Sequence, residues 1–203
     1  YRYELNRWRL RLQDLTRYGV RPVEVRDYHE IPMLLEQLRV RVLRRRVFVS
    51  GSFSGGGEWD IDRLNRFCYS LGERIIREEL DLSNGFGRGV GSPVITGAVE
   101  ELFRSGAQVI ERRLQLRPFP QTQPRNLSKA DVEERYRHDL LSSAGIVVVV
   151  AGNKMGSDGK LVLANGVQRE AEIARELFKP VLPIGASGFV ARELWDEMRA
   201  DLN

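Results

Sequence analysis

The sequence predicts an α/β fold in which a doubly wound parallel sheet is covered by helices on both faces. Strand-like and helix-like segments alternate along residues 45–203, the loops between them are short, and residues 145–151 are almost entirely apolar. Alternation of this kind is typical of parallel strands joined by crossover helices. A continuous apolar run is typical of a strand buried on both faces. Ahead of this domain, residues 1–44 predict a helix, a strand and a helix, too few elements for a core of their own.

In residues 3–18, apolar side chains recur at helical spacing, and Gly19 is well placed to cap that helix. In residues 20–25, apolar and polar side chains alternate, which predicts a strand. Residues 29–43 predict a second helix with Pro32 near its first turn. We expect residues 1–44 to be the end of a preceding domain or a linker. Because the chain opens without methionine and inside an amphipathic pattern, we also expect it to be a piece of a longer polypeptide.

The main domain then alternates regularly. Its predicted strands cover residues 46–50, 81–83, 107–114, 145–151 and 181–184, and its predicted helices cover residues 62–79, 93–103, 129–142, 165–178 and 191–202. Ser92 or Pro93 is expected to begin the second of these helices, and Ser128 to cap the third. Residues 117–124, which include three prolines, and the polar residues 152–159 predict surface loops.

Two glycine-rich segments follow neighbouring strands of the predicted sheet. Residues 50–57 read SGSFSGGG, and residues 85–91 contain four glycines in seven positions. Glycines let a backbone come close to a phosphate, and the start of a following helix supplies amides and a positive dipole. Because the carboxyl ends of parallel strands meet at one edge, residues 152–159 and the loop after residue 184 converge there too. The sequence therefore predicts a nucleotide-like ligand at this edge of residues 45–203.

Composition narrows the class of protein. Lys and Arg number 32 against 28 Asp and Glu, and the acidic residues are interspersed, which is typical of a mixed surface rather than a nucleic-acid stripe. The basic run at residues 39–46 favours a solvated linker over nucleic-acid binding. Cys68 is the only cysteine, which excludes an internal disulfide and a cysteine-rich metal site. No apolar stretch is long enough to cross a bilayer and the first residues lack signal-peptide character. We therefore expect a soluble, cytoplasmic protein.

Three ordered motifs resemble the SLOG superfamily: VFVSGS at residues 47–52, GFGRGVG at residues 85–91 and GVQRE at residues 166–170. That superfamily includes LOG-type nucleotide phosphoribohydrolases, Smf/DprA proteins and sensor domains attached to sirtuin-like NADases. The resemblance covers about residues 45–203 and implies a Rossmann-like fold. In LOG enzymes the third motif resembles Pro-Gly-Gly-x-Gly-Thr-x-x-Glu, whose glutamate acts at a ribose. Here the Pro-Gly-Gly turn is missing and Val167 stands at the threonine position, so Glu170 is expected to bind ribose hydroxyls. A favourable interaction with the helix dipole is the alternative role for Glu170.

The chain most resembles the STALD-type SLOG domains of the Thoeris antiphage-defence NADases. That family joins a sirtuin-like NAD hydrolase domain to a SLOG sensor, which binds a cyclic ADP-ribose isomer made by a TIR-domain partner. Residues 19–38 look like the last strand and helix of the sirtuin-like domain. The resemblance implies that NAD is the substrate of the whole protein, and that this chain holds no cofactor and no NADase active site. It also implies that the signal passes through contacts in a homo-oligomer, without a nucleic-acid or membrane partner.

The same resemblance implies the residues that bind the ligand. Arg137, Lys154 and Glu170 match the arginine, lysine and glutamate that hold the signal in that family. A planar guanidinium and a compact ammonium suit a diphosphate. Either Phe53 or Phe86 is expected to stack on adenine. The remaining expected ligand-binding positions lie on the loops: Gly51, Ser52, Gly87, Arg88, Gly89, Gly91 and Gly166. No catalytic residue and no metal ligand is expected.

Two other functions stay open at this point. A LOG-like phosphoribohydrolase would use Glu170 as its catalytic carboxylate and would release free base from AMP. A DNA-binding module of the Smf/DprA kind would need a contiguous basic face and would bind single-stranded DNA in a salt-sensitive manner.

Overall fold

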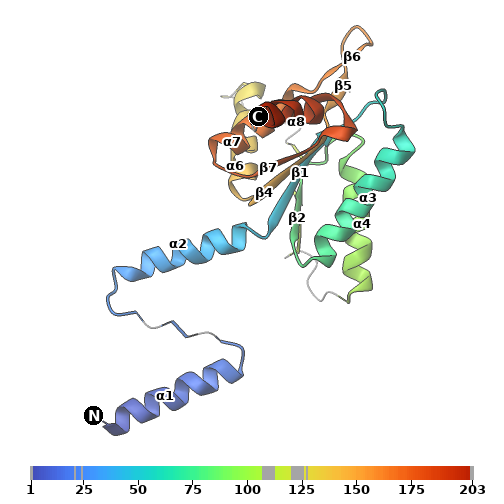
Figure 1. Cartoon of the computed structure of the whole chain (residues 1–203). Helices are drawn as coiled ribbons and strands as arrows, with labels where there is room; N and C mark the ends of the chain where they lie inside the picture. The colour runs from blue at the N-terminus through green and yellow to red at the C-terminus, as the bar shows by residue number, and fades with distance from the viewer. Residues whose placement is uncertain are drawn as a thin grey trace. The chain divides into compact units, whose positions relative to one another are not determined.

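The computed structural model describes residues 2–20, 22–23, 25–106, 113–119, 126 and 128–201. It divides the chain into two compact units, residues 1–39 and residues 40–203 (Figure 1). The first unit contains α1 (Arg2–Arg17) and most of α2 (Glu30–Leu43). No side chain of α2 is buried, and neither hydrophobic core of the described chain includes a residue before Val47.

The strand predicted at residues 20–25 is wrong for the residues that are described. Residues 20, 22, 23 and 25 lie outside any strand, and residues 21 and 24 fall outside the described part. The alternation of valines there favours a strand locally, but a strand needs a hydrogen-bonding neighbour. The described residues before 40 contain no second strand to serve as one.

The second unit is built on a sheet of five parallel strands in the order β3-β2-β1-β4-β7. The strands are β1 (Arg46–Ser52), β2 (Asp81–Asn84), β3 (Leu114–Leu116), β4 (Ile146–Ala151) and β7 (Val181–Ile184). The chain adds β2 and β3 on one side of β1 and then returns to place β4 and β7 on the other. The strand order therefore reverses between β1 and β4, which confirms the predicted doubly wound sheet and places its switch point there.

Helices cover both faces of this sheet (Figure 1). On one face lie α3 (Ile61–Arg77) and α4 (Gly91–Arg104), and on the other lie α6 (Lys129–Ser142), α7 (Asn165–Glu176) and α8 (Phe189–Ala200). Successive residues of β1 alternate between the two cores: Val47 and Val49 pack with α3 and α4, whereas Phe48 packs with the other three helices. A strand buried on both faces needs apolar side chains in both directions, which explains its unbroken apolar run.

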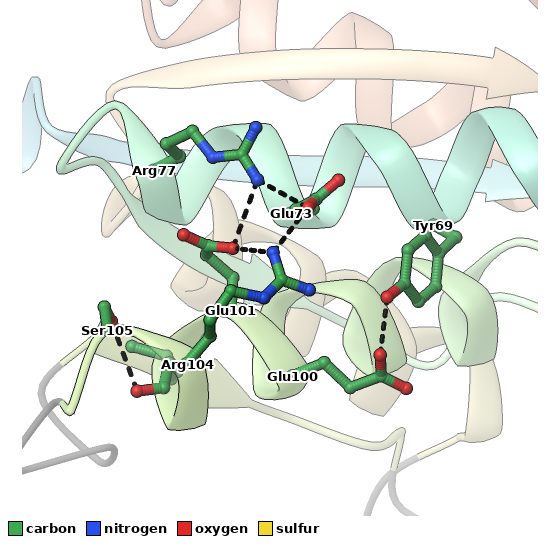
Figure 2. A network of polar contacts seen from close by, with 8 residues as sticks. Tyr69, Glu73, Arg77, Glu100, Glu101, Arg104 and Ser105 are labelled. Carbon is green, nitrogen blue, oxygen red and sulfur yellow. Dashed lines mark hydrogen bonds and ion pairs between the residues drawn. The ribbon is translucent and has the colours of Figure 1, made fainter.

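A network of charged side chains joins α3 to α4 (Figure 2). The largely buried carboxylate of Glu101 accepts hydrogen bonds from Arg104 at 2.5 Å and from Arg77 at 3.3 Å. Glu73 accepts from the same two guanidinium groups, at 2.7 Å and 2.5 Å. Each arginine thus bridges both helices.

Most predicted bounds differ from the structure by one or two residues, and three differences concern the segments near the carboxyl edge of the sheet. The third strand is Leu114–Leu116 instead of residues 107–114, of which residues 107–112 lie outside the described part. α4 begins at Gly91, with Val90 and not Ser92 at the N-cap position. The predicted loop at residues 152–159 contains β5 (Asn153–Met155), which pairs in an antiparallel hairpin with β6 (Leu161–Leu163). The hydrogen bond from Gly156 N to Lys160 O closes its turn.

Other expectations are confirmed closely. α6 spans residues 129–142 as predicted, and Ser128 caps it in a reciprocal capping box with Asp131. β7 also has its predicted bounds. Residues 117–119 of the predicted proline-rich loop have no regular structure, and residues 120–124 are outside the described part. Within the described residues, every helix is too short or too polar to span a bilayer.

Candidate ligand-binding site

A cavity of about 450 Å³ opens at the carboxyl ends of the central strands, beside the switch point between β1 and β4. Its floor is the end of β1, and its walls come from the loop after β2, the loop after β3, α6, the β5–β6 hairpin and the start of α7. These are segments far apart in the sequence that the parallel sheet brings to one edge. This is the edge at which the glycine-rich loops predict a ligand.

The cavity brings together most of the residues expected to bind a ligand. Its lining includes Gly51, Ser52, Gly87, Arg137, Lys154, Gly166 and Glu170. Four other expected residues do not line it: Phe53, Arg88, Gly89 and Gly91. Arg88 is exposed, whereas Phe53 is only 4% exposed and packs edge-on against Phe189 with ring centroids 6.4 Å apart. A buried ring cannot offer a face to adenine, so the structure excludes Phe53 and leaves Phe86 as the expected stacking residue that lines the cavity.

Close packing between the two glycine-rich loops accounts for several of their glycines. A Cβ atom on Gly87 would lie 2.0 Å from the carbonyl oxygen of Gly51, and one on Gly89 would lie 2.4 Å from that of Phe53. The Phe53 amide donates to the carbonyl of Arg88 at 2.8 Å. Those glycines let one loop rest on the other. Packing between the loops is therefore a second reason for glycine at these positions, besides the approach to a phosphate that the sequence suggested.

The start of α4 offers fewer amides than the sequence suggests. The amides of Val90 and Gly91 both donate to the carbonyl of Gly87, at 3.2 Å and 2.7 Å. Pro93 has no amide hydrogen to offer. Charged side chains thus carry more of the potential for anion binding in this cavity than the helix terminus does.

Glu170 is the buried acid of the site. It lies in the first half of α7, and its Oε2 accepts a hydrogen bond of 2.5 Å from the Ser50 hydroxyl at the end of β1. Burial raises the pKa of its carboxyl from the ordinary 4.5 to about 7, and the Ser50 hydrogen bond and the charge of Arg137 oppose only part of that rise. Near neutral pH, Glu170 therefore exchanges between its acidic and ionised forms.

Arg137 faces Glu170 from α6. One terminal nitrogen donates to Glu133 at 3.0 Å, and the guanidinium carbon lies 5.1 Å from the centre of the Phe119 ring. Its Nε lies 4.0 Å from Oε1 of Glu170, which is too long for a hydrogen bond, and this buried nitrogen has no other hydrogen-bond partner. A buried donor and a carboxylate oxygen thus lie close together without a direct hydrogen bond between them.

The β5–β6 hairpin brings Lys154 to the cavity. Asn153 fixes the hairpin, because its side chain accepts from the Ser54 amide at 2.9 Å and donates to the Gly55 carbonyl at 2.7 Å. The Ser52 hydroxyl donates to the Asn153 carbonyl at 2.8 Å. The first glycine-rich loop and the hairpin are therefore one connected wall, from which the exposed Lys154 lines the cavity.

The lining residues that were not expected from the sequence include Ser50, Phe119, Lys129 and Glu133. For two of these residues, the sequence contains a pattern from which their place in the site could have been predicted. Ser50 ends a predicted strand at the switch point, and Glu133 stands four residues before Arg137 on a predicted helix, at the spacing of an ion pair. Phe119 lies in the proline-bearing loop, and its approach to Arg137 depends on tertiary structure. In sum, three cations, Lys129, Arg137 and Lys154, and two carboxyls surround the cavity.

Comparison with known proteins agrees with this fold. The profile of the Sir2- and TIR-associating SLOG family, abbreviated STALD, matches residues 30–203. The chain belongs to the STALD family. Among curated relatives of this STALD chain are proteins named NAD(+) hydrolase ThsA. The one from Bacillus cereus (strain MSX-D12) is 32% identical over 99% of this chain and 41% of its own length, and the one from Cytobacillus dafuensis is 34% identical over 97% and 40%. The relative from Acinetobacter baumannii (strain 532279) is 32% identical over 100% and 43%.

The STALD chain thus spans about two fifths of the length of the curated relatives it matches. Among solved structures, the X-ray structure of the structural-genomics target TM1055 matches with a TM-score of 0.50. The match covers 73% of this chain and 79% of the other, at 19% identity. At that identity the likeness concerns the fold alone.

Proposed function

We propose that the cavity binds a cyclic ADP-ribose isomer, and that binding controls an attached sirtuin-like NAD hydrolase in antiphage defence. One observation carries the proposal: Nε of Arg137 and Oε1 of Glu170 face each other across 4.0 Å, and the nitrogen has no hydrogen-bond partner. A buried donor without a partner is unfavourable, so this arrangement favours a ligand that supplies the missing group.

A ribose hydroxyl that lies beside this pair can bridge the two atoms. Its oxygen accepts from Arg137 while its proton is donated to the carboxylate of Glu170, which uses both capacities of the hydroxyl. Lys154 and the guanidinium of Arg137 add positive charge for a diphosphate. A volume of about 450 Å³ lies within the range of sites for small organic ligands.

Control of a second domain requires the ligand to bind the resting and active forms with different affinities. We propose that rearranged contacts between subunits of a homo-oligomer supply this difference. In this account a TIR-domain protein makes the signal, and NAD is the substrate of the attached domain and not a cofactor of this one. The family's description and the NAD(+) hydrolase relatives support these partners.

A specific observation also favours a second candidate, a LOG-like nucleoside-monophosphate phosphoribohydrolase. A carboxyl group with a pKa near 7 beside a cavity suits a general acid, and Glu170 has such a pKa. This function predicts that the protein releases adenine from AMP and that Glu170→Gln abolishes the release. The missing Pro-Gly-Gly turn and Val167 in the place of threonine favour binding over hydrolysis.

A thermal-shift screen separates the two functions. The panel is ADP-ribose, its cyclic isomers, NAD and nucleoside monophosphates, each tested against the whole chain. A ligand that binds only the folded state raises the melting temperature by mass action. We expect the largest rise from a cyclic isomer and no release of base. A rise with AMP alone, accompanied by free adenine, would favour the enzyme, and no rise with any compound would contradict both functions.

A further inference from the structure

Phe86 stands out among the cavity residues because two unfavourable features meet in it. Its backbone has φ of 61°, in the left-handed region that bulky side chains rarely adopt. Its side chain is 48% exposed although it is large and apolar. Either glycine or asparagine would suit this backbone better, and a polar side chain would suit this exposure better.

The surrounding loop is built to hold Phe86 in that conformation. The buried side chain of Asn84 accepts a hydrogen bond from the Phe86 amide at 2.7 Å, and it donates to the Val49 carbonyl at 3.1 Å. Gly91 packs against the same backbone, because a Cβ atom there would lie 2.9 Å from the Cα of Phe86. Strain that several contacts enforce is characteristic of sites with a function.

Other aromatic rings near the cavity already pack against neighbouring side chains. Phe53 is buried against Phe189. The guanidinium carbon of Arg137 lies 5.1 Å from the centre of the Phe119 ring. The Tyr136 ring packs against Phe119 with ring centroids 4.9 Å apart. Among the aromatic rings that line the cavity within the described residues, Phe86 is the most exposed.

We propose that Phe86 is the platform on which the base of the bound nucleotide stacks. The inference rests on the proposed function and extends it by naming the residue that recognises the base. Stacking on an aromatic face buries the apolar surface that Phe86 otherwise exposes, and it accepts any flat heterocycle. Hydroxyl and phosphate groups are then left to Arg137, Glu170 and Lys154, on the other walls of the cavity.

The experiment compares Phe86→Asn with Phe86→Tyr and with Phe178→Asn. Phe178 is a matched control, because its φ is 53° and its side chain is 94% exposed, yet it does not line the cavity. Each variant is titrated calorimetrically with cyclic ADP-ribose isomers, and its adenine absorbance is followed for the hypochromic change that stacking produces. Melting temperatures are recorded without nucleotide.

We expect Phe86→Asn to bind about ten-fold more weakly or worse and to lose the absorbance change, because stacking contributes most of that difference. Phe86→Tyr and Phe178→Asn should bind as the unaltered chain does. Both asparagine variants should melt at or above the melting temperature of the unaltered chain, since each removes backbone strain.

Unchanged affinity in Phe86→Asn would overturn the proposal that Phe86 stacks on the base, as would a lower melting temperature of this variant. If Phe86→Asn bound normally but Arg137→Ala abolished binding, the proposed function would stand and only the role of Phe86 would be wrong. An unaltered chain that binds no isomer would remove both.

Discussion

The hydroxyl of Ser50 donates a 2.5 Å hydrogen bond to the carboxylate of Glu170, although 120 positions separate the two residues. Ser50 lies near the carboxyl end of the central strand β1, and Glu170 lies in the first half of α7. This contact joins the sheet to α7 at the bottom of the cavity. It also fixes which carboxylate oxygen remains for Arg137 and for a ligand.

Replacing Ser50 with alanine should raise the pKa of Glu170 further above 7, because the hydrogen bond from Ser50 is the larger of the two effects that lower it. Removing a hydrogen bond to a buried charge should also lower the free energy of unfolding at pH 8 by about 1–3 kcal/mol. Carbon-13 NMR titration of the carboxyl carbon measures the first effect and urea unfolding the second. Ser142→Ala, which removes only a local bond to the Asp139 carbonyl, should leave that pKa unchanged.

Stability should depend on pH through Glu170. Its pKa is about 7 in the folded protein and 4.5 ordinarily, so between these values the folded chain holds a proton that the unfolded chain has lost. The free energy of unfolding from this group therefore falls as the pH rises from about 4.5 to 7, by about 1.4 kcal/mol for each unit of pKa difference. Urea unfolding across this window should show the fall in the unaltered chain and its absence in Glu170→Gln. Glu172→Gln, on the exposed side of the same helix, should keep it. Identical pH profiles in all three proteins would show that Glu170 is not buried as described.

Gly87→Ala should disturb the contact between the two glycine-rich loops. Its new Cβ atom would lie 2.0 Å from the Gly51 carbonyl oxygen, so one loop has to move away from the other. Overpacking of this kind lowers the free energy of unfolding by about 1–3 kcal/mol, which chemical denaturation measures. At Gly156 the nearest obstacle is the mobile end of a side chain, the Asp158 carboxylate, at 2.9 Å. Gly156→Ala should therefore be milder, and equal effects would contradict the loop packing.

Asn153→Ala should loosen the wall that holds Lys154. The variant loses the hydrogen bonds to the Ser54 amide and to the Gly55 carbonyl. Hydrogen exchange at Ser54 should become faster, because its amide is then protected only by local structure. Asn165→Ala changes an exposed asparagine at the start of α7 and serves as the control. Unchanged protection at Ser54 in Asn153→Ala would mean that another contact anchors the loop.

Much of the fold follows from local patterns in the sequence. The apolar runs at β1 and β4 predict strands buried on both faces, and the capping residue Ser128 predicts the start of α6. Both signals are local, since burial on two faces favours a run of apolar residues and a cap requires its own side chain. The parallel topology follows from the alternation of elements.

The misplaced boundaries have non-local causes. β6 has only three residues, too few for periodicity to separate it from a loop, and it is defined by its pairing with β5. α4 starts earlier than predicted because the carbonyl of Gly87 accepts hydrogen bonds from the amides of Val90 and Gly91. No capping side chain takes part, so the sequence contains no residue that predicts this start.

The candidate site was foreseen in part. The family resemblance indicated Arg137, Lys154 and Glu170, and the structure places all three on one cavity. Ser50 and Phe119 were missed because a hydroxyl and an aromatic ring gain their roles from what the fold sets opposite them. For the same reason, burial excludes Phe53 although it stands in a promising loop.

The most direct test of the central claim is calorimetric titration of Arg137→Ala and Lys154→Ala with cyclic ADP-ribose isomers. Arg135→Ala and Lys160→Ala are matched controls, because each changes an exposed cation on the same element or its turn that does not line the cavity. The account predicts that both cavity variants remain folded and lose binding, whereas both controls bind as the unaltered chain does. Unchanged affinity in Arg137→Ala and Lys154→Ala would contradict it.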